Sequence, residues 1–324
     1  MKIAYSCYEL KRRDGAGKRT GALLRVDFED GTRGYADLHP WTELGDKPLK
    51  EHLQLLVTHT NNLTPLLIKS IAFARVDAQA RAVKVNLFDD ITIPPSHRLV
   101  PNIMQWSASS LEQDFLQGFR YFKIKMGDAV DRECAKLKQI LEETSGVEVR
   151  LRLDFNMKLL RGQFETFLEE IAPWSSKIDF IEDPFAYDPI FWQAMQEKYC
   201  VNLAADKPAI HALRDGFNAA KVLVVKPAVD QEREFITSQT SQAFVFTSYL
   251  DHPFGQMCAA CVAAEMMRHQ PQRMKTCGLL SHYVYETTPF SELLHGKGPF
   301  LQAPTGTGFG FDDLLEKQNW LALA

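Results

Sequence analysis

The feature that most constrains the fold of this chain is a strand–helix alternation that begins near residue 99. Seven short apolar runs typical of strands are each followed by a helical pattern, at 99–104, 121–125, 148–154, 177–182, 202–206, 222–226 and 243–247. One further extended piece is expected within 275–284. Strands separated by helices run parallel, and about eight of them predict a sheet closed into a barrel. An open doubly wound sheet would need a glycine-rich first turn, and the sequence after Met104 has none.

The first 90 residues follow a different pattern. Apolar extended runs at 1–10 and 21–28 flank the glycine-rich basic segment Arg12–Arg19, and Glu29–Thr32 has the residues of a hairpin turn. Apolar residues then recur with helical spacing from 48 to 85. We therefore expect an α+β unit here. The basic segment has two interpretations, a solvated hairpin tip or a mobile flap that closes over an anionic substrate.

Composition excludes several classes of function. A net charge of −4 gives no support to binding of nucleic acid or of an anionic membrane. No apolar run approaches the roughly 20 residues that a membrane-spanning helix needs. The six cysteines are scattered and no secretory signal precedes them, which predicts free thiols and a cytoplasmic location. The Cys258–Cys261 pair lies among small apolar residues, so we interpret it as packing.

Five consecutive predicted strands end in a charged residue, namely Lys125, Asp154, Glu182, Asp206 and Lys226. In a parallel barrel these ends meet at one mouth, where catalytic groups lie. Three carboxylates on adjacent strands would repel one another unless a cation lies between them, and oxygen donors of this kind suit Mg²⁺. The alternative is a network of salt bridges between the carboxylates and the lysines that closes the barrel.

Alternation along two strands predicts which side chains share a face. Lys123 and Lys125 point the same way, and each ammonium makes it easier for the other to lose its proton, which is one way to obtain a lysine base. The alternative places both lysines on the wet face of an edge strand. Arg150, Arg152 and Asp154 also share a face, so we expect the arginines inside the barrel and Arg152 holding Asp154 or Glu182.

Taken together, five motifs resemble the enolase superfamily and, more narrowly, its muconate-lactonising subgroup. They are Lys123-x-Lys125, Leu153-Asp-Phe-Asn156, Ile181-Glu-Asp-Pro184, Ala204-Ala-Asp206 and Val225-Lys-Pro227. The resemblance implies an α/β fold, a modified (β/α)8 TIM-type barrel with an N-terminal α+β capping domain completed by the C-terminal tail. The implied segments are a capping domain at 1–96, a barrel domain at 97–290, and a segment at 291–324 that returns to the capping domain.

The resemblance also implies roles for residues. Asp154, Glu182 and Asp206 would hold Mg²⁺, which would bind a small-molecule carboxylate substrate and stabilise its enediolate. Lys125 would be the base, Lys123 would tune its charge, and Lys226 would face the opposite side of the substrate. Asn156 would lie close to the metal or the substrate. The chain departs from the pattern at Lys207, where the superfamily often has a glutamate, and mildly at Asp183.

Subgroup members with two such lysines include racemases, epimerases, cycloisomerases and o-succinylbenzoate synthases. A short chain and the absence of an acidic pair in Cys277–Ser281 favour the last of these, a dehydratase of menaquinone biosynthesis. The basic segment is expected to help hold a dicarboxylate, and Thr247 and Ser248 are expected to donate hydrogen bonds to its succinyl arm. Alternatives are an N-acylamino acid racemase, another epimerase or cycloisomerase, and a degenerate barrel that only binds ligands.

The histidines add little to this interpretation. His252 and His282 are candidates to line the pocket, and the other seven are expected to be peripheral. The sequence does not predict the oligomeric state.

Overall fold

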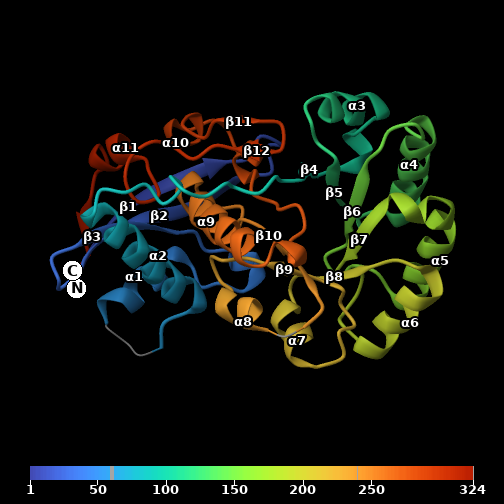
Figure 1. Cartoon of the computed structure of the whole chain (residues 1–324), viewed down its shortest axis with the longest axis horizontal. Coiled ribbons are helices and arrows are strands. Elements are labelled where there is room, and N and C mark those ends of the chain that lie inside the picture. The colour runs from blue at the N-terminus through green and yellow to red at the C-terminus, as the bar shows by residue number, and fades with distance from the viewer. Residues whose placement is uncertain (59–61, 239, 324) are drawn as a thin grey trace.

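The molecule consists of an N-terminal sheet-and-helix unit beside a parallel barrel, and the C-terminal segment lies against the first unit (Figure 1). The computed structural model describes residues 1–58, 62–238 and 240–323. In these residues no helix is both long and apolar enough to cross a membrane.

The N-terminal unit is an antiparallel sheet covered by two helices. Strands β1 (Lys2–Lys11), β2 (Lys18–Asp27) and β3 (Arg33–Leu38) pair in sequence order. Helices α1 (Leu49–Val57) and α2 (Pro65–Ala82) pack on the sheet. A Cβ at Gly34 would collide with the backbone carbonyl of Ala74, so glycine lets α2 approach β3 closely.

The parallel sheet follows the predicted alternation. Among the described residues it has seven strands in the order β10-β9-β8-β7-β6-β5-β4. They are β4 (Arg98–Val100), β5 (Tyr121–Lys125), β6 (Arg150–Asp154), β7 (Ile178–Glu182), β8 (Leu203–Ala205), β9 (Val222–Val225) and β10 (Ala243–Phe246). The intervening helices are α3 (Ala108–Leu116), α4 (Val130–Glu143), α5 (Arg161–Ile171), α6 (Pro189–Tyr199), α7 (Ala209–Arg214), α8 (Glu232–Thr237) and α9 (Pro253–His269). Short 3₁₀ helices are η1 (Thr42–Leu44), η2 (Ile103–Gln105), η3 (Ala172–Lys177), η4 (Pro271–Arg273) and η5 (Ser281–Val284).

The predicted first and last barrel strands differ from the structure. β4 is shorter than the predicted strand 99–104, because the chain turns into η2 at Ile103. The extended piece expected within 275–284 forms isolated parallel bridges, from Gly278 to Thr247 and from Cys277 to Ser96. Backbone hydrogen bonds from this segment reach both β10 and the residues just before β4. It therefore joins the two edges of the sheet without forming a regular strand.

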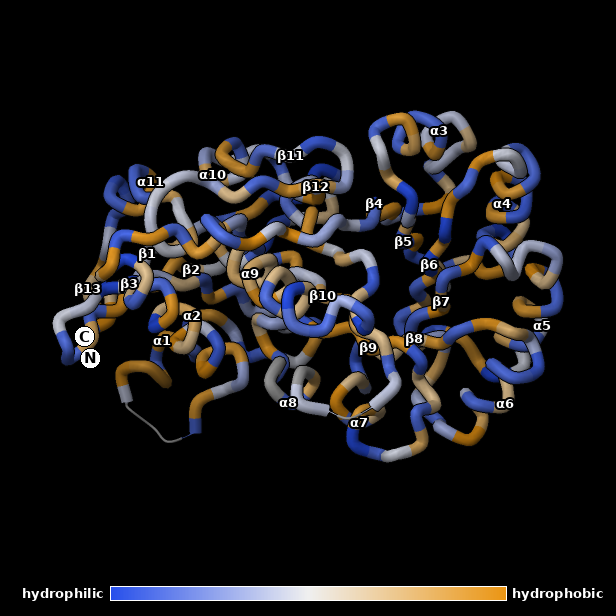
Figure 2. Tube along the Cα trace, viewed as in Figure 1, coloured by the Kyte–Doolittle hydropathy of each residue, from blue (hydrophilic) through white to orange (hydrophobic). Residues whose placement is uncertain are grey.

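Apolar packing follows the two periodicities of the sequence, alternation along the strands and one apolar face along the helices. Val222, Val224 and Val245 form a cluster with Phe180 and Ala204, and these residues alternate along the barrel strands. The tubes of α4 and α5 alternate between hydrophobic and hydrophilic colours, as expected for helices with one face on the barrel (Figure 2). Cys258 and Cys261 are free and buried on α9, which confirms that they serve packing.

The C-terminal segment lies along the N-terminal unit. It contains α10 (Pro289–Glu292), β11 (Gly296–Lys297), β12 (Phe300–Leu301), α11 (Asp312–Glu316) and β13 (Leu321–Ala322). β13 pairs with β1, and the two termini lie side by side in Figure 1. Arg81 of α2 forms an ion pair with Asp312. These contacts support the proposed return of segment 291–324 to the capping domain.

Candidate functional site

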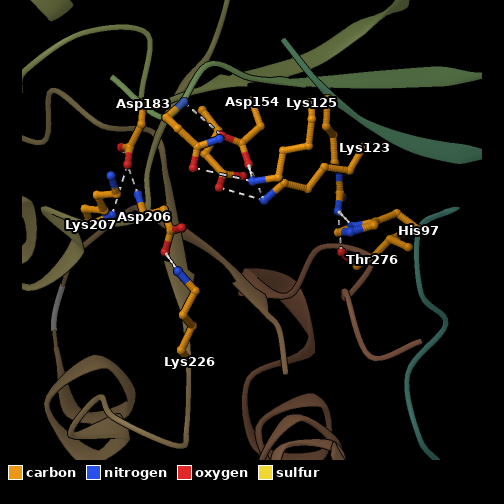
Figure 3. Close-up of polar contacts among 12 residues, drawn as sticks. His97, Lys123, Lys125, Asp154, Asp183, Asp206, Lys207, Lys226 and Thr276 are labelled. Carbon is orange, nitrogen blue, oxygen red and sulfur yellow. Dashed lines mark hydrogen bonds and ion pairs between the residues drawn. The ribbon is translucent and has the colours of Figure 1, made fainter. Parts of the chain in front are cut away.

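The charged residues at the strand ends lie together at one mouth of the barrel (Figure 3). Lys125, Asp154 and Glu182 are the last residues of β5, β6 and β7, and the parallel register places them opposite one another. Asp206 follows β8 directly, and Lys226 follows β9 directly. The register of a parallel sheet therefore converts spacing along the sequence into one group of charges.

Ion pairs connect the carboxylates to lysines on two sides. Lys123 Nζ lies 2.7 Å from Glu182 Oε1 and 3.0 Å from Asp154 Oδ2. Lys125 Nζ lies 2.6 Å from the same Asp154 oxygen, so the two lysines of β5 do share a face. From β9, Lys226 forms an ion pair with Asp206. These are the contacts expected of the salt-bridge alternative, and they leave the lysines of β5 and β9 on either side of the carboxylates.

Neighbouring charges and burial shift the pKa values of the charged residues at the barrel mouth. Burial lowers the pKa of Lys123, but the charges of Asp154 and Glu182 outweigh it and raise that pKa above its usual value. The prediction that a neighbouring ammonium makes Lys123 easier to deprotonate is therefore wrong. Burial and the charge of Asp154 raise the pKa of Glu182 to about 8. Burial opposes ionisation of Lys226, but the charge of Asp206 keeps the pKa of its ammonium above the usual value.

The three carboxylates fit a hard cation in their chemistry. Glu182 Oε2 is buried with no hydrogen-bond partner, so one ligand oxygen is left free. As they stand, no three or more His, Cys, Asp or Glu side chains within 1–58, 62–238 and 240–323 form a group that could hold a metal ion. Lys123, Lys125 and Lys226 form ion pairs with these carboxylates. The donor set of three carboxylates is the kind that Mg²⁺ binds.

Asp183 and Asn156 contact other residues of the charged group. Asp183 accepts hydrogen bonds from the backbone N–H groups of Asp206 and Lys207, each at 3.1 Å. It thereby fixes the turn that carries the third carboxylate, a role that the sequence analysis missed. Asn156 Oδ1 lies 3.5 Å from Lys125 Nζ, so the predicted Asn156 lies beside that lysine. Lys207 itself is exposed.

Arg152 lies inside the barrel but not where we predicted. Its Nε donates to Asp179 Oδ2 at 2.9 Å, and its Nη1 donates to Thr276 O at 2.6 Å. The prediction that it holds Asp154 or Glu182 is therefore wrong. The register between β6 and β7 shifts by one residue after Leu151, and the extra residue is Asp179. This irregularity explains why strict alternation does not identify Asp179 as the partner.

Segment 275–284 takes the place of an eighth barrel strand and is called the eighth segment here. The polar residues near it divide into two kinds. Thr247 Oγ1 and Ser248 Oγ are buried without hydrogen-bond partners. By contrast, His252 accepts a hydrogen bond from the backbone N–H of Phe254 at the start of α9. His282 Nδ1 is hydrogen-bonded to Gln256 Oε1. Both histidines thus have structural partners. The prediction that the remaining histidines are peripheral is wrong for three of them: His39, His52 and His97 are buried.

Residues 12–17 of the basic segment connect β1 to β2, whereas Lys18 and Arg19 begin β2, and the segment is docked at its base. Arg13 donates a hydrogen bond to Thr287 Oγ1 at 2.9 Å, and Arg12 forms a bridge with Tyr285. Arg19 stacks on the ring of Trp41, with its guanidinium carbon 3.3 Å from the ring centroid. The partners of the basic segment thus come from the N-terminal unit, with Trp41, and from residues 285–287.

Comparison with known proteins places this geometry in context. Residues 3–80 match the family described as "O-succinylbenzoate synthase, N-terminal domain". The chain is 33% identical to an o-succinylbenzoate synthase of Bdellovibrio bacteriovorus, over 100% of this chain and 99% of that protein.

Solved structures share the fold. One is described as a mandelate racemase/muconate lactonizing enzyme from Roseiflexus sp., with a TM-score of 0.78, 16% identity, and coverage of 95% of this chain and 96% of that chain. Another is a dipeptide epimerase from Enterococcus faecalis, with a TM-score of 0.75, 16% identity, and coverage of 95% and 98%. At this identity the likeness shows the fold, which agrees with the predicted barrel and capping unit.

Proposed function

Because the chain belongs to the o-succinylbenzoate synthase family, we propose that it is a lyase that removes water from a cyclohexadiene carboxylate to form o-succinylbenzoate, a step of menaquinone biosynthesis. The observation that carries the proposal is similarity along the whole chain to a protein of that name. The lysines on either side of three carboxylates supply the groups that such a reaction needs.

Lys125 is the proposed base. It takes the proton from the carbon next to the substrate carboxylate, and the same ammonium then gives a proton to the hydroxyl that leaves on that face. The C–O bond breaks as the ring becomes aromatic, so the products are the aromatic acid and water. Asp154 and Asn156 flank Lys125 Nζ at 2.6 and 3.5 Å and would orient it.

Lys226 is proposed to stay charged and to stabilise the negative charge that develops on the substrate. Its pKa is raised by the neighbouring Asp206 against the effect of burial, which keeps the ammonium protonated at neutral pH. A fixed ammonium opposite the base stabilises the dianion without giving up its proton. Lys123, paired with Asp154 and Glu182, would hold the carboxylates in place.

Asp154, Glu182 and Asp206 would hold Mg²⁺. When bound, the metal would supply the positive charge that binds the substrate carboxylate and stabilises the dianion. Thr247 and Ser248, whose buried hydroxyls have no partner, would donate hydrogen bonds to the succinyl arm. The six cysteines, all within the described residues, are free, and we propose a cytoplasmic setting on that basis.

The test is a spectrophotometric assay with 2-succinyl-6-hydroxy-2,4-cyclohexadiene-1-carboxylate, with Mg²⁺ and with a chelator. We expect the diene absorbance to disappear only when Mg²⁺ is present. Persistence of the diene in a protein that binds Mg²⁺ would reject the proposal.

A racemase of N-acylamino acids is the second candidate. The observation that favours it is the position of Lys125 and Lys226 on opposite sides of the carboxylates, since a racemase needs an acid–base group on each face. Exchange of the α-proton of an N-acylamino acid in deuterated water, without turnover of the diene, would select this reaction. A protein that shows neither reaction and binds no metal would be a degenerate barrel.

A further inference from the structure

His97 occupies space inside the barrel that Gly278 leaves open. The backbone N–H of His97 donates to Cys277 O at 2.7 Å, so the residue just before β4 lies beside the eighth segment. A Cβ added at Gly278 would lie 2.7 Å from His97 Cε1, 2.9 Å from His97 Nε2 and 2.8 Å from Thr247 Cγ2. Any other residue at 278 would displace the ring. The imidazole therefore lies between the start of β4 and the end of β10.

Arg152 fixes the tautomer of this imidazole. Its Nη1 lies 2.9 Å from His97 Nδ1, and a guanidinium can only donate. Nδ1 must therefore accept, which leaves the hydrogen of the neutral ring on Nε2. Burial, with the charges of Arg152 and Lys123, holds the pKa of His97 well below its usual value, so the ring is neutral. Thr276 O and Asp179 hold Arg152 in turn, and Figure 3 shows His97 beside Thr276.

The Nε2–H group has no protein acceptor. Among the residues that the structure describes, none accepts a hydrogen bond from it, whereas Nδ1 is engaged. His97 as a whole is 6% exposed, and near it Thr247 Oγ1 and Ser248 Oγ are buried without hydrogen-bond partners. Buried donors without acceptors are costly, and sites that bind polar ligands are where such donors occur. Two buried hydroxyls without partners, next to a ring N–H from which no described residue accepts a hydrogen bond, favour a ligand that carries oxygen acceptors.

We propose that His97 is a substrate-orienting residue that donates a hydrogen bond from Nε2 to an oxygen of the substrate's side arm, and that Arg152 is the positioning residue that holds the required tautomer. This inference rests on the proposed function, because that substrate carries a succinyl arm with carbonyl and carboxylate oxygens. It assigns the arm to the side of the mouth where the eighth segment lies between β10 and the start of β4.

The kinetic test compares His97→Phe, which keeps a ring but loses the donor, with His97→Gln, whose amide can replace Nε2–H. For the cyclohexadiene substrate with saturating Mg²⁺, we expect KM to rise at least tenfold in His97→Phe while kcat changes less than threefold. We expect His97→Gln to restore KM to within about threefold of the wild type. His52→Phe, the same change at a buried histidine of α1, serves as the control. Equal KM values for wild type and His97→Phe would overturn the inference.

A second measurement does not depend on turnover or on the folding of the Phe variant. Nitrogen-15 NMR of the histidine rings, with the His97 signal assigned by its loss in His97→Gln, should show the Nε2–H tautomer. Adding the product o-succinylbenzoate should move the Nε2–H proton downfield. A ring protonated on Nδ1, or an Nε2–H signal unchanged by bound product, would overturn the inference. Failure of the proposed function is distinguishable, because then the wild type would neither turn over the diene nor bind the product.

Discussion

At the scale of single residues, the group at the barrel mouth is a balance between ammonium and carboxylate charges. Asp154 pairs with both lysines of β5, and Glu182 keeps one buried oxygen without a partner. A substitution here therefore changes chemistry more than packing. Two changes separate the roles that we propose for the base and for the carboxylates.

Removal of the base should abolish turnover without unfolding the protein. Lys125→Ala deletes the group that accepts the α-proton, and we expect kcat to fall at least 10³-fold. Circular dichroism and the melting temperature should stay close to those of the wild type. Lys198→Ala, at an exposed lysine of α6, is the matched control. Turnover within tenfold of the wild type would assign the base to another residue.

Loss of one carboxylate should weaken the binding of Mg²⁺. Glu182→Gln replaces the carboxyl group, whose Oε2 is unpartnered, with an amide, and it keeps the side-chain shape. We expect the Kd for Mg²⁺, measured by isothermal titration calorimetry, to rise at least tenfold. The wild-type enzyme titrated in the same buffer sets the reference. An unchanged Kd would mean that Mg²⁺ binds through other residues.

At the scale of elements, β6 shows how one strand serves both chemistry and stability. Asp154 at its end faces the mouth, whereas Arg152 two residues earlier is completely buried and is paired with Asp179. Lys275 from the eighth segment reaches the same Asp179, at 2.6 Å. This buried network links β6, β7 and the segment that closes the barrel.

Breaking that network should cost considerable stability. Arg152→Met removes one partner of a buried charge pair, and we expect the free energy of unfolding to fall by about 3–5 kcal/mol. Urea denaturation followed by circular dichroism measures the change. Arg150→Met, on the same strand but exposed, should change it by less than about 1 kcal/mol. Similar losses in both variants would show that the Asp179 pair contributes little.

At the scale of the whole molecule, two aspartates meet where the N-terminal unit contacts the barrel. A Cβ at Gly255 would lie 2.5 Å from Asp37 Oδ2 and 2.7 Å from Asp251 Oδ2, so the carboxyl groups of β3 and of the loop before α9 are neighbours. Tyr8 donates a hydrogen bond to Asp37, and the backbone N–H of His252 donates another. Burial raises the pKa of Asp37 to about 7, and that of Asp251 is also raised, by burial and by Asp37.

This pair should make stability depend on pH. Asp37 binds its proton more tightly when folded than when unfolded, where its pKa is about 4. Its contribution is therefore complete below pH 4 and is lost as pH rises through about 7. We expect the stability of Asp37→Asn relative to the wild type to increase by about 2 kcal/mol between pH 5 and pH 8.

Denaturation at both pH values measures that difference. Asp90→Asn, at an exposed residue of the connector after α2, controls for the loss of one surface carboxylate. A difference between Asp37→Asn and the wild type that is the same at pH 5 and pH 8 would contradict the prediction.

The sequence by itself determined the parallel barrel and the set of charges at its mouth. Both depend on local periodicity: a strand–helix unit repeats, strands alternate in face, and parallel register places Lys125, Asp154 and Glu182 at one level. Each of these features depends on the pattern within one strand–helix unit, so spacing along the chain is enough to predict them.

Only the tertiary structure decided which side chains meet across the barrel. The shift at Asp179 supplies the partner of Arg152, and the irregular segment at Gly278 makes room for His97. It also decided that lysines hold the carboxylates, which raises the pKa of Lys123 instead of lowering it. These contacts join residues 27 to 181 positions apart, and they depend on how the sheet closes, which local periodicity does not encode.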